Sequence, residues 1–192
     1  MNNSMNRRTF IRLITSITAS YPASALLSTR AHAQSISNIA IDEPWRTLAT
    51  VQEHLFPATE DSPGAADIQA LVFLQNMLNA PDTDNNEKEF ISNGVSWLND
   101  ISTKNHKMSF IELNELDKEK VLRQIEQSQA GERWLSLLLT YLIEALLSDP
   151  VYGGNPDGIG WKWLEHQPGF PRPDTDKMFY KLGNPKYTRT KA

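Results

Sequence analysis

Histidine is the side chain in this sequence best suited to acid–base or metal chemistry, but its spacing supports neither role. His54, His106 and His166 lie far apart, without the H-x-x-x-H or H-E-x-x-H spacing that places two imidazoles on one helix face. Glu53 precedes His54, which favours a pair on a helix surface over a metal ligand. No Gly-x-Ser-x-Gly elbow is present to position a serine nucleophile. The sequence therefore predicts no catalytic residue and no metal site.

Cysteine is absent from the chain. Its absence excludes disulfides, thiolate ligands for a metal, a cysteine nucleophile and the covalent attachment of a c-type haem. We expect this chain to hold no cofactor of its own. The reactive side chains thus point to a role other than catalysis.

The segment 149–163, DPVYGGNPDGIGWKW, has the most unusual composition in the chain. A phosphate-binding loop is not indicated, because no Gly-Lys-Ser/Thr follows its glycines and no strand precedes them. Asp149, Asn155 and Asp157 lack the spacing of an EF-hand calcium loop and its twelfth-position glutamate. Two compatible interpretations remain. The segment is an interface loop, because exposed Trp and Tyr anchor protein contacts, or a rigid loop packed on its own domain.

Proline and glycine predict the path of this segment. Pro150 ends the preceding helix, and Gly153-Gly154 permit positive φ angles or a close approach of backbones. The run 155–158 fits a type I turn, with Pro at its second position and Gly at its fourth. A short helix within 159–166 follows. The residues that we predict to contact a partner protein are Tyr152, Gly153, Gly154, Asn155, Trp161 and Trp163.

Helical periodicity predicts the helices that must position this segment. Apolar residues at helical spacing predict helices over 43–55, 65–79 and 87–102, and a fourth from Asn114 onward. The fifth helix, 132–148, has polar residues at a strict four-residue step, and every other position from Trp134 to Leu147 is apolar. Such a helix must be surrounded, so we predict that it is the central helix. The predicted fold class is all-α, a small helical domain around one central apolar helix, with a Gly/Pro/aromatic-rich C-terminal loop and an extended tail.

The first 33 residues have the pattern of a twin-arginine export signal. Arg7 and Arg8 precede Phe10, a moderately apolar stretch follows, and Ala31 and Ala33 frame a cleavage site of A-x-A form. This route exports proteins that have already folded. A protein on this route commonly holds a cofactor loaded in the cytoplasm, or travels with a partner that does. We expect the twin-arginine translocase as a partner and the periplasm as the destination.

The predicted boundaries are 1–33 for the signal, 34–42 for a linker, 43–173 for the helical domain and 174–192 for a C-terminal tail. The tail is basic and thinly apolar, so we expect it to be disordered or to lie as an arm on a partner. Four of the 19 basic residues lie in the signal, which leaves 15 basic and 23 acidic residues and a net charge of −8. We expect no nucleic-acid partner for so acidic a chain.

The segment 149–173 also resembles a known family. An acidic residue, Pro, Tyr, Gly-Gly-Asn, then Gly-Trp-Lys and a closing Pro-Gly occur here in that order. This pattern is similar to the family named after subunit 3 of gluconate 2-dehydrogenase. The same family supplies small subunits of flavin-dependent glucose, fructose and sorbitol dehydrogenases. The resemblance covers the rest of the mature chain loosely, including the twin-arginine start and the leading helices.

The resemblance implies a non-catalytic small subunit of a periplasmic complex, associated with the inner membrane through its partner subunits. The implied partners are a catalytic flavoprotein that holds FAD and oxidises a sugar or sugar acid, and a c-type cytochrome that holds haem c. The flavoprotein would leave the cytoplasm on the signal of the small subunit, which would also stabilise it. The family offers no catalytic residue to transfer. The alternatives are an independent periplasmic helical protein that binds a small ligand, and a stand-alone enzyme.

Overall fold

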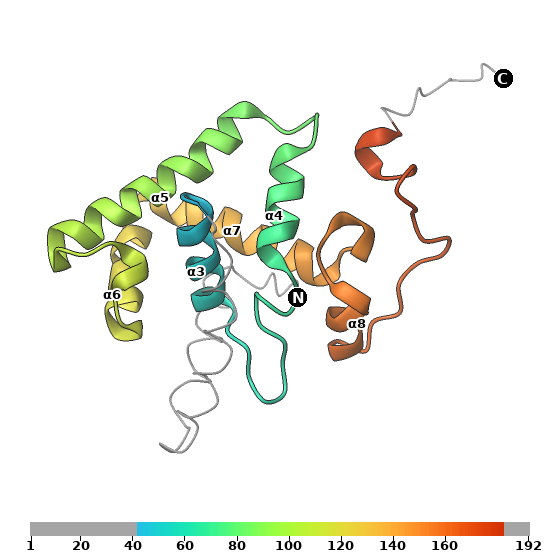
Figure 1. The fold of residues 1–192 in the computed structure, drawn as a ribbon, viewed down its shortest axis with the longest axis horizontal. Helices are drawn as coiled ribbons and strands as arrows, with labels where there is room; N and C mark the ends of the chain where they lie inside the picture. Colours follow the sequence, from blue (N-terminus) through green and yellow to red (C-terminus); the bar gives the residue numbers. More distant parts are fainter. Residues whose placement is uncertain (1–41, 183–192) are drawn as a thin grey trace, which may run out of the picture. The chain divides into compact units, whose positions relative to one another are not determined.

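The computed structural model describes residues 42–182 of the chain (Figure 1). The predicted signal residues Arg7, Arg8, Phe10, Ala31 and Ala33 lie outside this range. Most of the predicted linker and residues 183–192 of the predicted tail also lie outside it. The predictions for these parts of the chain stay predictions.

Residues 42–182 are helical and contain no strand, which confirms the predicted all-α class. The α-helices are α3 (Trp45–Leu55), α4 (Ala70–Asn79), α5 (Asn85–His106), α6 (Glu115–Glu126), α7 (Gln129–Leu147) and α8 (Ile159–Trp163). Short 3-10 helices lie among and after them: η3 (Phe110–Glu112), η4 (Pro150–Tyr152), η5 (Pro156–Gly158) and η6 (Phe179–Lys181).

Helix α7 is the central element, because it contacts α3, α4, α5, α6 and α8. Its side chains Trp134, Leu138 and Ala145 are fully buried. The indole Nε1 of Trp134 donates a hydrogen bond of 3.0 Å to the backbone oxygen of Ile91 in α5. The largest side chain of the core therefore buries no unpaired polar atom. The predicted central helix is confirmed.

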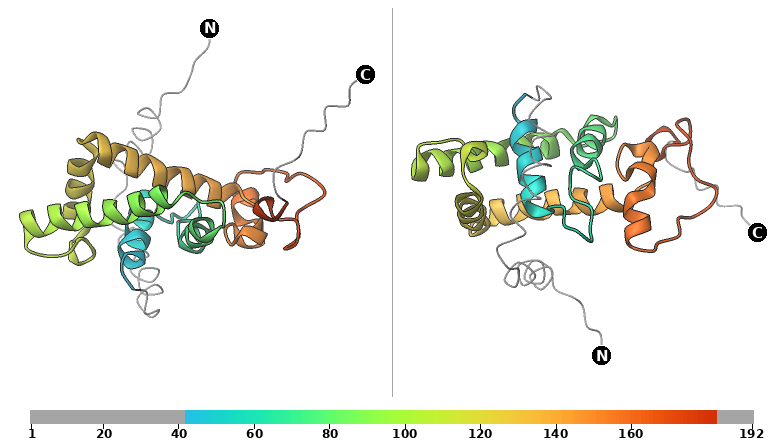
Figure 2. Two further views of the ribbon diagram at one scale, coloured as in Figure 1. Left: turned by 90° about the horizontal axis from the view of Figure 1, so that it is seen from above. Right: turned by 60° about the horizontal axis from the view of Figure 1, so that its bottom comes forward.

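One face of α7 differs from the prediction of a helix enclosed on all sides. In Figure 2, α3, α4 and α5 lie on the same side of α7. Ile143 and Leu147 of α7 remain 44% and 43% exposed. Apolar side chains therefore flank the polar stripe of α7 without a covering element from residues 42–182. The sequence pattern does not distinguish this face from a buried one, because its residues are equally apolar.

Helix boundaries differ from the predictions where a cap or a turn decides them. Helix α7 begins at Gln129 rather than at residue 132, because the Ser128 hydroxyl accepts a hydrogen bond from the backbone N–H of Gly131 (3.0 Å). Helix α4 begins at residue 70 rather than at residue 65, because the turn before it ends at Gln69 with φ 54°. Asp84 caps α5, which runs over 85–106 rather than 87–102.

Candidate functional site

Asn155 is the residue that fixes the segment after α7 to the rest of the domain. It is fully buried. Its side-chain Nδ2 donates to the backbone oxygen of Ser148 (3.0 Å), and its Oδ1 accepts from the backbone N–H of Gly160 (2.7 Å). Its own backbone N–H donates to the oxygen of Ile68 (2.9 Å). One asparagine thus connects the end of α7, the start of α8 and the turn before α4.

The two glycines before Asn155 serve the two purposes that the sequence predicts. Gly153 has φ 93°, in the region that favours glycine. A Cβ on Gly154 would lie 2.7 Å from the backbone oxygen of Ala145 in α7, so only glycine allows this approach. The predicted type I turn is wrong, however. Asp157, at the third position of the turn, has φ 54°, whereas a type I turn requires a negative φ there.

Trp161 is buried between the C-terminal end of α7 and the side chain of Arg172, which follows α8 in the chain. It is 8% exposed, and its indole Nε1 donates a hydrogen bond of 2.7 Å to the backbone oxygen of Leu147. That carbonyl lies in the last turn of α7, where backbone carbonyls have no hydrogen-bond donor within the helix. The guanidinium of Arg172 lies over the ring, 5.1 Å from its centroid. The indole therefore covers the C-terminal end of the central helix and supplies a hydrogen-bond donor to it.

Asp149 holds Arg172 in this position. Arg172 donates to both carboxylate oxygens of Asp149, from Nε at 2.7 Å and from Nη2 at 3.2 Å. The hydrogen bond from Arg172 lowers the pKa of Asp149, burial raises it, and the backbone N–H of Val151 lowers it again. The net direction is below the ordinary value, so Asp149 is ionised at neutral pH. This two-point contact joins the chain after α8 to the start of η4.

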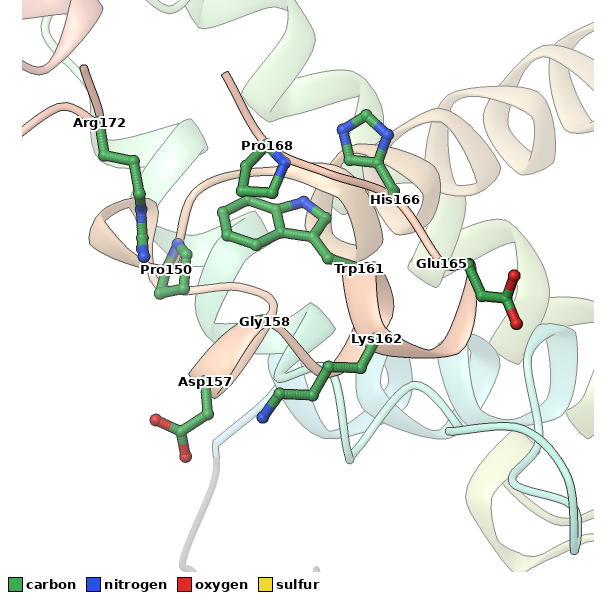
Figure 3. Close-up of a pocket in the computed structure, with 9 residues that line it drawn as sticks. All are labelled: Pro150, Asp157, Gly158, Trp161, Lys162, Glu165, His166, Pro168 and Arg172. Atoms are coloured by element: carbon green, nitrogen blue, oxygen red, sulfur yellow. The ribbon is translucent and has the colours of Figure 1, made fainter. Parts of the chain in front are cut away.

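An open hollow of about 780 Å³ lies beside Trp161 (Figure 3). The indole of Trp161 is in the middle of the view, with Arg172 on one side and His166 on the other. Asp157, Lys162 and Glu165 also line the hollow, so its charges are mixed. Such a wall favours neither a strongly anionic nor a strongly cationic ligand.

Trp163 differs from Trp161 in that it lies at the surface. It is 40% exposed, and its ring lies 6.1 Å from the ring of Phe56, which follows α3. Leu164 beside it is 44% exposed. Of the six residues predicted to contact a partner, Trp163 is thus the one whose large aromatic side chain the structure leaves exposed. Asn155 and Trp161 are buried within the domain.

Tyr152, the remaining predicted contact residue, binds the chain that follows. Its backbone oxygen accepts from Asn76 Nδ2 of α4 (3.0 Å), and its hydroxyl oxygen accepts from the backbone N–H of Phe179 (3.1 Å). The rings of Tyr152 and Phe179 lie 5.7 Å apart. Residues 174–182 of the predicted tail therefore lie on their own domain in this structure.

His54 has partners that sequence reasoning missed. Its Nδ1 lies 3.1 Å from a carboxylate oxygen of Glu115, and its Nε2 lies 2.9 Å from one of Glu119. Both glutamates are in α6, four residues apart and so on one helix face, which was the available signal. Carboxylates only accept hydrogen bonds, so both contacts form together only when both ring nitrogens carry a proton. Charged His54 would thus connect α3 to α6.

Within residues 42–182, no group of three or more His, Asp or Glu side chains is placed to hold a metal ion. None of the helices in the same range is both long enough and apolar enough to cross a bilayer.

Comparison with known protein families identifies a relationship for most of the described domain. The model of a family described as Gluconate 2-dehydrogenase subunit 3 matches residues 42–169, more than half of the chain. The matched range contains every helix from α3 to α8 and ends before Arg172. No curated protein and no solved structure matches the chain.

Proposed function

The chain belongs to the gluconate 2-dehydrogenase subunit 3 family, and on this premise we propose that it is the non-catalytic small subunit of a flavin-dependent sugar or sugar-acid dehydrogenase complex. The family match over residues 42–169 is the observation that carries the proposal. It includes the whole segment 149–163, in which the side chain of Asn155 is hydrogen-bonded to Ser148 and Gly160.

The proposed contact with the catalytic flavoprotein is centred on Trp163. Its ring and that of Phe56 form an aromatic pair at the surface, and Leu164 adds exposed apolar area beside them. Aromatic side chains on a rigid frame lose little conformational entropy when they bind, which makes them effective anchors. Asn155 and Trp161 supply that frame from within the domain. In this proposal they act on the partner only by holding α8 in place.

The proposed second role is that of an export escort. The sequence carries a twin-arginine pattern at Arg7 and Arg8, and this route accepts proteins that have already folded. A flavoprotein that takes up its FAD in the cytoplasm must be exported in the folded state, so it suits the same route. A bound small subunit with a signal would carry it through the twin-arginine translocase. The assembled complex, with its c-type cytochrome, would then lie in the periplasm at the inner membrane.

Purification from the native cells tests the subunit assignment. A tag on the C-terminus of this chain should retain a larger, yellow chain with the absorbance of an oxidised flavin, in a constant ratio to this chain. A tagged chain that purifies alone, in extracts that contain active flavoprotein, would contradict the assignment. It would favour the alternative of an independent helical protein.

Exchange of both arginines tests the escort role separately. The double variant Arg7→Lys and Arg8→Lys should leave this chain and the flavoprotein together in the cytoplasmic fraction. The control is the double variant Lys104→Arg and Lys107→Arg, which exchanges the same residue types in the helical domain and should be exported normally. Normal export of the flavoprotein beside the Arg7/Arg8 variant would contradict the escort role and leave the subunit assignment intact.

A further inference from the structure

The outer face of α7 carries exposed apolar side chains in the second half of the helix. Ile143 is 44% exposed and Leu147 is 43% exposed. Helices α3, α4 and α5 all pack on one side of α7 and leave these two side chains uncovered (Figure 2). Large apolar side chains on one face of a helix are surface that the ridges of a second helix can bury. This face therefore fits a helical partner.

The first half of the same face is built from smaller side chains. At about 100° per residue, Ser136 and Thr140 lie on the side of α7 that carries Ile143 and Leu147. The Thr140 hydroxyl donates to the backbone oxygen of Ser136 (2.9 Å), so it is satisfied within its own helix and its methyl group is free to pack. The face thus has small side chains toward its start and large ones toward its end. Two such faces fit each other when the helices run in opposite directions.

Two charges of opposite sign border this face. Arg133 and Glu144 are both exposed and lie about three turns apart along one edge of α7. Within residues 42–182, Arg133 has no carboxylate beside it, and its guanidinium lies over the Phe90 ring, 5.4 Å from the centroid. Glu144 has no cation beside it in the same range. Partial burial, and then the charge of Glu87, raise the pKa of its carboxyl. Each of the two groups therefore lacks a partner of the other's kind.

We propose that the outer face of α7 binds the same face of a second copy of this chain. The face comprises Arg133, Ser136, Thr140, Ile143, Glu144 and Leu147. The two helices run antiparallel, about a twofold axis near the midpoint between the two charges. In an antiparallel pair the same edge of both helices meets, so Arg133 of each copy reaches Glu144 of the other. Ser136 of each copy lies opposite Ile143 of the other, a small side chain against a large one.

The choice of a second copy follows from the order of the groups along α7. A twofold pair needs one surface that complements itself, in which a group near one end matches a group near the other. The outer face has this order twice, once in its cation and anion and once in its small and large side chains. Contact with a different protein requires no such symmetry. The flavoprotein contact is proposed at Trp163 of α8, so the pairing goes beyond the subunit assignment and fails independently of it.

The mass of the protein in solution tests the pairing. The full chain, purified without other subunits, should sediment as a dimer at micromolar concentrations and dissociate on dilution. Ile143→Glu places a carboxylate among the apolar side chains of the pair and should shift the protein to the monomer. The matched control is Val72→Glu, at a residue of α4 that is 43% exposed, and this variant should still dimerise. A monomeric wild-type chain, or the same mass for both variants, would overturn the proposal.

Exchange of the two charges tests the antiparallel arrangement. Arg133→Glu and Glu144→Arg should each weaken the dimer roughly tenfold or more, because each places like charges opposite one another at both ends of the pair. The double variant should recover the dimer, since both ion pairs form again with their signs exchanged. Thermal melting of each variant checks that it is folded. Single variants that dimerise normally, or a double variant that does not recover, would overturn the proposal. So would an Ile143→Glu variant that keeps the dimer and loses the flavoprotein, because the flavoprotein would then cover this face.

Discussion

Trp161 and Trp163 show how strongly the environment of one residue type changes over two positions. They are separated by one residue on α8, so their side chains point to different sides of the helix. Trp161 faces the end of α7 and donates to the Leu147 carbonyl, while Trp163 lies at the surface beside Phe56. The sequence predicted a role for both as contacts. It could not separate them, because a five-residue helix has no period long enough to show which side is buried.

Truncation of Trp161 should destabilise the isolated subunit. Trp161→Ala removes a buried indole, leaves the Leu147 carbonyl without its side-chain donor and removes the ring beneath Arg172, so the expected loss is about 3–5 kcal/mol of unfolding free energy. Thermal melting followed by circular dichroism measures it. Trp161→Phe, which keeps a ring but no N–H, should lose less. An unchanged melting temperature for Trp161→Ala would show that the contact of the indole with the end of α7 does not stabilise the domain.

Truncation of Trp163 should weaken the complex instead. Trp163→Ala removes the proposed anchor, and the expected cost is about 2 kcal/mol, or roughly thirtyfold in affinity for the flavoprotein. The melting temperature of the free subunit should change little, because the ring is exposed. The matched control is Trp97→Ala, which removes a partly exposed tryptophan of α5 whose ring lies 5.7 Å from Phe90. Equal loss of affinity in both variants would argue against a contact centred on Trp163.

At the scale of elements, charged side chains of α6 connect that helix to α3. Burial raises the pKa of Glu115, but hydrogen bonds from Lys118 and His54 outweigh it, and the net direction is downward. Burial likewise raises the pKa of Glu119, and bonds from His54 and Arg123 bring it below its ordinary value. Both carboxylates are thus more acidic in the folded state than in the unfolded chain. Their contribution is fully present above an ordinary glutamate pKa.

The lowered pKa values of these two glutamates predict that the folded protein loses stability in acid. Because the folded pKa values of Glu115 and Glu119 lie below the ordinary glutamate value of 4.5, stability should fall as the pH drops through and below that value. Melting temperatures recorded across this pH range measure the fall. Glu119→Gln should reduce the fall, since it removes one of the two groups, and Glu60→Gln, at an exposed position in the loop after α3, should not. The same pH profile in all three proteins would contradict the prediction.

The elements that the sequence predicts best are those with long, regular apolar spacing. The central position of α7 follows from its composition, while its start at Gln129 depends on the Ser128 cap. The start of α4 depends on the left-handed backbone of Gln69, which no residue type there signals. The His54 contacts join elements 61 and 65 residues apart in sequence, so only the fold brings them together. Local patterns thus predict elements, and long-range packing decides the contacts.

For the whole molecule, the proposed assignment of the cofactors to partner subunits leads to a spectroscopic prediction. The chain has no cysteine for haem attachment and no G-x-G-x-x-G fingerprint for a dinucleotide. Purified without its partners, it should show no flavin or haem absorbance and no dehydrogenase activity with sugars or sugar acids. The co-purified complex serves as the positive control. A stoichiometric flavin band in the isolated chain would contradict the assignment of the cofactor to the partner.

The position of Asn155 also bears on how the protein ages. Asparagine deamidates when the backbone nitrogen of the next residue attacks the side-chain carbonyl and closes a cyclic imide. The next residue here is Pro156, whose nitrogen carries no hydrogen, so the cyclic imide route is closed. A carboxylate at this position would turn Nδ2, the donor to the Ser148 carbonyl, into a second acceptor in a fully buried site. Asn155, which joins three elements, is thus protected from deamidation, a change that would disrupt the contacts between them.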